Sequence, residues 1–179
     1  MNIVDESLEH VNRLIEQLDL DGAEKELQRL IAKHPESVVV LRSWGILEHL
    51  RGNHEHAIEY LDRAIKGNPN DSIAFVCAGQ AYRAMGALPL AEANLRRALH
   101  IEPGRHDAHL NLALTLWSMG EHARAGVYFR NVGSLGRKSA QAEFYLGLLD
   151  LEAGNPDSAM RHFDACLEIN PEYSDARAQ

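Results

Sequence analysis

Histidine is the residue type whose number and spacing first suggest chemistry, because the chain contains ten of them. His49, His54 and His56 cluster at the end of one expected helix and in the turn after it, and His106 and His109 lie three residues apart on another. Imidazoles at such spacing can bind zinc or nickel. No cysteine or set of carboxylates accompanies them, so ordinary surface histidines are the favoured interpretation. We predict no metal and no other cofactor.

The two cysteines belong to no catalytic or metal-binding motif. Cys77 and Cys166 stand far apart in the sequence, and a protein of the reduced cytoplasm is the simplest interpretation. Cys77 lies near the binding face predicted below and is a candidate reactive thiol, although a small apolar filler is the favoured role. The sequence contains no nucleotide-binding loop, nucleophile elbow or paired-carboxylate motif. We therefore predict that the chain is not an enzyme.

The charge balance limits the kinds of partner. The formal net charge of the 179 residues is −8, which argues against a general binder of nucleic acid or of anionic membranes. No segment approaches the roughly 20 apolar residues that a membrane helix needs. The acidic N-terminus, MNIVDESLEH, lacks the basic character of a signal peptide. We predict a cytoplasmic protein without membrane insertion.

The elements that must position these side chains recur with a period of 34 residues. One alanine and one proline return in phase, and each repeat is predicted to be a helix, a turn and a second helix. These residues are Ala23, Ala57, Ala91, Ala125 and Ala159, and Pro35, Pro69, Pro103 and Pro171. The period predicts repeats at residues 4–37, 38–71, 72–105, 106–139 and 140–173 in a single domain. Residues 174–179 are predicted to begin a truncated sixth repeat or cap, so the chain is expected to be a fragment of a longer protein, with Met160, Phe163 and Leu167 partly exposed.

Small residues at two positions of each repeat predict how the paired helices pack. Gly45, Gly79, Ala113 and Gly147 fall inside the first helices, where glycine costs about 1 kcal/mol relative to alanine. We expect them to allow close approach of the second helix, with the repeated alanine as the matching small residue. Glycines at 52, 86, 120 and 154 are expected to close the first helix.

Three positions depart from the repeated pattern. Val11 and Leu18 replace the small residue and the turn glycine in the first repeat, and Arg137 replaces the proline in the fourth. Gly133 and Gly136 are expected to break the helix there instead.

With these motifs in phase, the chain resembles tetratricopeptide repeat proteins over residues 4–173. The resemblance implies an all-α fold, a right-handed α-solenoid of five antiparallel helix-turn-helix repeats. It also implies a concave groove, lined by the first helix of each repeat, that binds an extended or helical segment of a protein partner.

The predicted groove residues follow from helical spacings of four and three on each first helix. The groove begins basic and polar and becomes apolar, and Trp117 and Tyr145 are the predicted anchors because aromatic residues dominate binding hot spots. The alternative is that Leu110, Leu114 and Trp117 belong to the core and that Arg42 and Arg83 are ordinary solvated charges. The predicted groove residues are Arg42, Ile46, His49, Val76, Gln80, Arg83, Leu110, Asn111, Leu114, Trp117, Phe144, Tyr145 and Leu148.

One familiar ligand class is rejected by the residues present. Tetratricopeptide domains that bind the acidic C-termini of heat-shock chaperones use a two-carboxylate clamp of lysine, arginine and asparagine. The equivalent places here hold Arg42, Ile46, Cys77, Asp107 and Asn111, so cations and amides of the clamp are missing.

Three functions remain. The leading hypothesis is a protein-interaction scaffold that binds a partner peptide, with acidic groups of the partner near Arg42 and Arg83. A second is the substrate-recruiting domain of a larger enzyme, such as a glycosyl- or sulfotransferase. A third is self-assembly, as a homodimer, through the uncapped C-terminal repeat.

Overall fold

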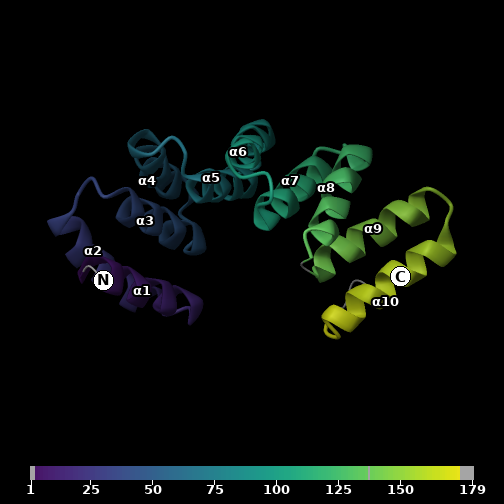
Figure 1. Cartoon of the computed structure of the whole chain (residues 1–179), viewed down its shortest axis with the longest axis horizontal. Coiled ribbons are helices and arrows are strands. Elements are labelled where there is room, and N and C mark those ends of the chain that lie inside the picture. Colours follow the sequence, from purple (N-terminus) through teal and green to yellow (C-terminus); the bar gives the residue numbers. More distant parts are fainter. Residues whose placement is uncertain (1–2, 137, 174–179) are drawn as a thin grey trace. The chain divides into compact units, whose positions relative to one another are not determined.

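The chain is all-α, as predicted. The computed structural model describes residues 3–136 and 138–173, with side chains from residue 6, and within these residues it contains ten α-helices and no strand (Figure 1). The helices are α1 (Ile3–Glu16), α2 (Leu20–Lys33), α3 (Val38–Leu50), α4 (His54–Gly67), α5 (Ser72–Ala84), α6 (Leu88–Ile101), α7 (His106–Ser118), α8 (His122–Ser134), α9 (Ala140–Glu152) and α10 (Pro156–Ile169). None of these helices is both long and apolar enough to cross a membrane.

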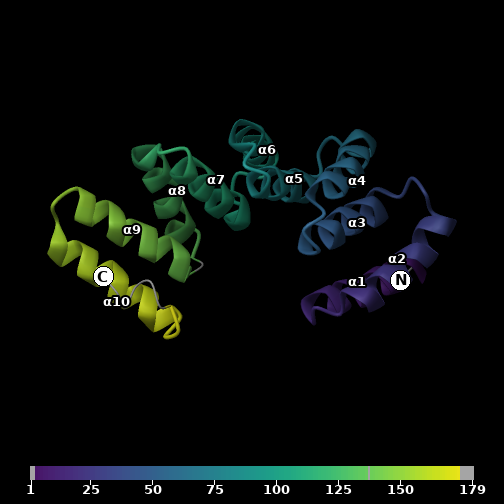
Figure 2. The same ribbon diagram turned by 180° about the vertical axis from the view of Figure 1, so that it is seen from behind.

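Each predicted repeat forms one helical hairpin. Consecutive helices pack in pairs, from α1 with α2 to α9 with α10, and the pairing of α9 with α10 is visible from both sides in Figures 1 and 2. Gly86, like the other turn glycines, has a positive φ, here 75°, as predicted. Leu18 keeps the same turn without glycine, at a φ of 58°. The first repeat therefore closes like the others, at the cost of a backbone conformation that side chains disfavour.

The glycines inside the first helices do allow close approach, but their nearest neighbour differs from the prediction. A Cβ atom on Gly79 would lie 2.6 Å from Cγ of Leu95, and one on Gly45 would lie 2.5 Å from Cγ of Leu61. The repeated alanine contributes only its carbonyl oxygen, which for Ala91 would lie 3.3 Å from the Gly79 Cβ. The missing side chain thus makes room for the large residue one helical turn after the alanine.

The chain divides into two compact units, Met1–Ile101 and Glu102–Gln179. In the first unit, one core cluster includes Val11, Leu27 and Trp44, and the ring of Trp44 stacks on Tyr60 with centroids 5.4 Å apart. A second cluster joins α3, α4 and α5 around Leu61. In the second unit, residues of α9 and α10 form an apolar cluster that includes Phe144, Phe163 and Cys166.

The end of the fourth repeat differs from the expectation. Gly133 stays inside α8, and Gly136 alone adopts a positive φ, of 75°, just beyond the end of that helix. A glycine that retains helical backbone does not end a helix, whereas the left-handed conformation does. Arg137 lies outside the described residues.

The C-terminal predictions meet a mixed outcome. The predicted start of a sixth repeat at residues 174–179 lies outside the described residues. In α10, Met160 is 59% exposed and Leu167 half-buried, as expected. Phe163 is buried, which makes the expectation of exposure wrong, because its ring packs 5.9 Å from that of Phe144.

Candidate functional site

In the first unit, the predicted binding face lies along α3 and α5. The side chains of Arg42, Ile46, His49, Gln80 and Arg83 are half-buried, so part of each reaches the surface. Their spacing of four and three residues puts them along one face of each helix. Ile46 also packs against the core cluster around Leu61, so this face continues the core outward. Val76, by contrast, is only 2% exposed and forms part of the interior.

The two arginines of this face have different surroundings. Arg42 Nη1 donates to Asp71 Oδ2 at 2.5 Å, and Asp71 is buried. The other carboxylate oxygen of Asp71 accepts from the backbone N–H groups of Ile73 and Ala74, both at 3.1 Å, and so caps the start of α5. Arg42 therefore neutralises a structural carboxylate. Arg83 has no such partner among the described residues, and its buried Nε makes no hydrogen bond there.

A pair of histidines lies beside this face. His49 at the end of α3 and His54 at the start of α4 place their Nδ1 atoms 3.2 Å apart, which is hydrogen-bond distance. Burial lowers the pKa of His49, and the nearby charges of His54 and Arg83 lower it further. His56 is not part of this pair, and its Nδ1 atom lies 4.0 Å from Oε2 of Glu48. Within the described part of the chain, no cluster of three or more metal-ligating side chains is assembled.

In the second unit, the predicted binding face lies along α7 and α9 and is partly covered. Leu110, Trp117, Tyr145 and Leu148 are half-buried and remain available at the surface. The other three predicted residues, Asn111, Leu114 and Phe144, are buried. The Asn111 side chain donates to the backbone oxygen of Asp107 at 2.8 Å, so its amide serves its own helix.

The predicted anchors belong to an intramolecular aromatic cluster. The ring of Trp117 stacks on His122 with centroids 4.0 Å apart and planes 7° apart, and lies 4.8 Å from the ring of Tyr145. Tyr145 in turn stacks on Phe129 at 5.0 Å. These contacts join α7, α8 and α9 in one packed unit. Both rings therefore have a structural role, and their contact with a partner stays a prediction.

Sequence reasoning missed His122, although a signal was present. His122 follows Trp117 by five residues, as His54 follows His49, and 122 − 54 = 68, or two periods of the repeat. In both repeats the histidine that begins the second helix packs its ring on the last predicted groove residue of the first helix: His54 on His49, and His122 on Trp117.

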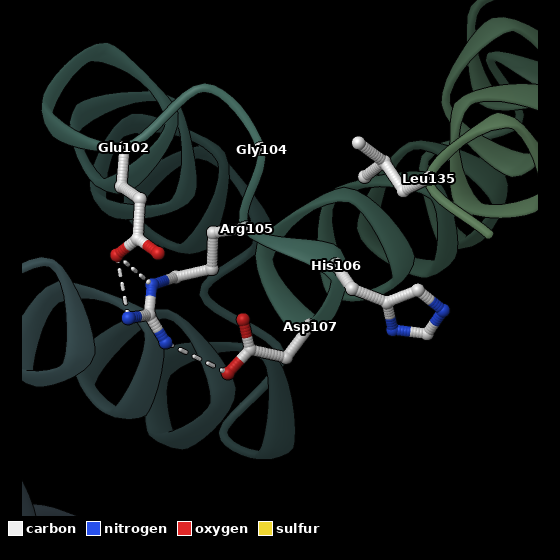
Figure 3. Close-up of a pocket in the computed structure, with 6 residues that line it drawn as sticks. All are labelled: Glu102, Gly104, Arg105, His106, Asp107 and Leu135. Carbon is white, nitrogen blue, oxygen red and sulfur yellow. Dashed lines mark hydrogen bonds and ion pairs between the residues drawn. The ribbon is translucent and has the colours of Figure 1, made fainter. Parts of the chain in front are cut away.

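A polar hollow of about 290 Å³ lies where the loop before α7 meets the end of α8. Arg105 at its edge donates through Nε to Glu102 at 2.8 Å and through Nη1 to Asp107 at 3.3 Å (Figure 3). The His106 ring points away from this network, and its Nε2 is buried without a hydrogen-bond partner among the described residues. The charges in the hollow are matched within the loop, so it presents neither a nucleophile with a base nor an unmatched cation.

Comparison with known proteins gives a consistent result. Two family models described as tetratricopeptide repeat match residues 8–72, 78–132 and 141–173. Human tetratricopeptide repeat protein 6 is 26% identical over 129 residues, which are 70% of this chain and 25% of that protein. The chain thus spans about a quarter of the length of this curated relative.

Solved structures show the same fold. MamA is 25% identical, with a TM-score of 0.76 and coverage of 97% of this chain and 98% of MamA. PilF of Pseudomonas aeruginosa is 17% identical, with a TM-score of 0.83 and coverage of 98% of this chain and 80% of that chain.

Proposed function

Because the chain belongs to the tetratricopeptide repeat family, we propose that it is a protein-interaction scaffold that binds a partner through the exposed faces of its first helices. The observation that carries this proposal is the composition of those faces. Ile46, Leu110 and Leu148 are apolar and half-buried on helices whose other sides already pack in the core. A helix that keeps apolar side chains on its solvent side as well is typical of a binding surface.

The proposed ligand is an amphipathic or extended peptide. A peptide bound to the first unit would pack its apolar side chains on Ile46. A peptide bound to the second unit would pack them on Leu110 and Leu148. The acidic groups of a peptide bound to the first unit would lie near Arg83, whose charge is not matched within the described residues, rather than near Arg42, which pairs with Asp71.

The two other hypotheses stay predictions. A substrate-recruiting domain of a larger glycosyl- or sulfotransferase would use the same faces, so the scaffold role is common to both. Self-assembly as a homodimer through the C-terminal repeat is supported by Met160, which is 59% exposed on α10. A cytoplasmic location and a non-catalytic role are likewise part of this proposal.

The test compares one substitution at two places. Gln80 on α5 is half-buried on the proposed face, and Gln28 on α2 is exposed on a second helix of the same unit. Gln80→Glu places a negative charge on the binding face, where it repels the acidic groups of the proposed peptide. Gln28→Glu makes the same change of charge and size on α2. Proteins captured from the source cell by the unaltered chain should be lost with Gln80→Glu and kept with Gln28→Glu. Equal capture by both variants, with unchanged circular dichroism, would contradict the proposal.

Trp117→Ala is a poor test of binding on its own. Removing the indole opens the cluster with His122, Phe129 and Tyr145, so a loss of partner would not separate binding from packing. A charge change at Leu110, which is half-buried, addresses the second unit with less damage to that cluster.

A further inference from the structure

We propose that Arg83, His49 and His54 form a binding site for a carboxylate, and that binding is accompanied by uptake of one proton by the two imidazoles. The inference deepens the proposed function and rests on it, because it states which chemical group of the partner this part of the first unit recognises. The ligand class is an aspartate or glutamate side chain or a C-terminal carboxylate.

Arg83 supplies the unmatched charge. Its Nε is buried, and among the described residues it has no hydrogen-bond acceptor. The side chain as a whole is half-buried, so part of it reaches the surface and can meet a ligand. A carboxylate suits an arginine especially well, since its two oxygens can accept from two guanidinium nitrogens together.

The histidine pair supplies an adjustable donor. With the Nδ1 atoms of His49 and His54 3.2 Å apart, one carries a hydrogen and donates it to the bare Nδ1 of the other. The donor ring then has a bare Nε2, and the acceptor ring has an Nε2–H. One added proton, taken by the bare Nε2, gives both rings an N–H at Nε2 and leaves their mutual hydrogen bond intact. A second proton would break that bond, so uptake stops at one.

The surrounding charges explain the coupling. Burial, and the charges of His54 and Arg83, lower the pKa of His49, so without a ligand the His49 ring tends to be neutral near pH 7. The negative charge of a bound carboxylate offsets these positive charges and raises the pKa of His49 again.

Carboxylates of α2 and α3 near the pair have partners of their own, and Glu55, beside His54 on α4, is exposed. Glu48 beside His49 on α3 accepts from Asn53 at 2.8 Å, and His56 lies 4.0 Å from the same carboxylate. From α2, Asp21 and Glu24 pair with Arg51. No described carboxylate pairs with Arg83.

The experiment uses two small probes and the full chain. Acetyl-triglutamate amide offers only side-chain carboxylates, and acetyl-trialanine with a free C-terminus offers only the terminal one. Titrations followed by NMR of the arginine Nε–H and histidine Cε1–H signals, at pH 5.5, 6.5 and 7.5, report on the three residues directly. Glutamate stays ionised over this range, since its ordinary pKa is about 4.3.

The expected result has three parts. The Arg83 and histidine signals shift and saturate with at least one probe, and that probe identifies the source of the carboxylate. The dissociation constant falls with falling pH by at most tenfold per unit, the limit for one proton. Arg83→Gln abolishes the shift, His54→Gln removes most of its pH dependence, and Arg96→Gln on the outer helix α6 changes neither.

Two results would overturn the inference: neither probe shifting the Arg83 signal, or Arg83→Gln binding like the unaltered chain at every pH. Failure here is separable from failure of the proposed function. Partner capture that is sensitive to Gln80→Glu, without probe binding, would leave the scaffold role standing and reject the carboxylate site. Probe binding together with capture that is unaffected by Gln80→Glu would support the carboxylate site and reject the scaffold role.

Discussion

Replacing Gly79 by alanine tests the packing of the hairpins at a single atom. The added Cβ would lie 2.6 Å from Cγ of Leu95 and 3.0 Å from its Cδ2. Leu95 is fully buried, and Cγ is the branch point of its side chain, so relief requires the whole side chain or the helix to move. The carbonyl oxygen of Ala91, 3.3 Å from the new Cβ, limits movement in the other direction.

The expected size follows from two opposing effects. Overpacking a filled core costs about 1–3 kcal/mol. Alanine in place of glycine in a helix interior gains about 1 kcal/mol. Because the clash involves a buried branch atom rather than a flexible tip, we expect Gly79→Ala to lower the free energy of unfolding by about 1–2 kcal/mol overall.

Urea denaturation followed by circular dichroism measures this change, and two variants make it specific. Gly133 lies in α8, and a Cβ added to it would have no atom of the described residues within 4 Å, so Gly133→Ala should instead stabilise by up to about 1 kcal/mol. Leu95→Ala removes the clashing group, so the double variant with Gly79→Ala should be less destabilised than the sum of the single changes. A stabilising Gly79→Ala, or strict additivity with Leu95→Ala, would refute the close-approach explanation.

Three further changes have expected outcomes. Leu18→Gly relieves a positive φ at a side chain that is 72% exposed, and should raise the free energy of unfolding by about 0.5–1 kcal/mol; a lower urea midpoint would contradict this. Because the pKa of His49 is lowered below 6.5 on folding, the unfolded chain binds more protons between the two pKa values, so stability is lost as pH falls through that window. His49→Gln should make the free energy of unfolding less dependent on pH in this window, and an unchanged dependence would contradict the role of His49. Burial and the charge of Glu143 raise the pKa of Cys166, so in a Cys77→Ala background maleimide should label the native chain far more slowly than the urea-unfolded chain.

The repeat architecture was predictable because equivalent positions meet equivalent neighbours. The spacing of Gly45 and Gly79 alone indicates where helices approach closely, and their partners Leu61 and Leu95 lie one period apart as well. Leu18 was not predictable in the same way. Its residue type argues against a left-handed turn, yet the hairpin around it adopts one, since tertiary packing can override a local preference.

The candidate site was less predictable, because its properties depend on pairs from different helices. The spacing on α3 and α5 places Arg42 and Arg83 on comparable faces, but only the structure shows that Asp71 neutralises the first and that the second lacks a partner among the described residues. Likewise, the residue type and helical spacing of Trp117 predict an exposed anchor. Only the structure shows that its ring stacks on His122, because that contact joins α7 to α8.

The most direct test of partner binding by the first helices is photo-crosslinking in the source cell. A benzophenone amino acid at Gln80 on α5 and one at Gln28 on α2 are compared in otherwise unaltered chains. The proposed function predicts a defined crosslinked protein from position 80 and none from position 28. Crosslinks from position 28 alone, or the same product from both, would contradict binding on the first-helix face.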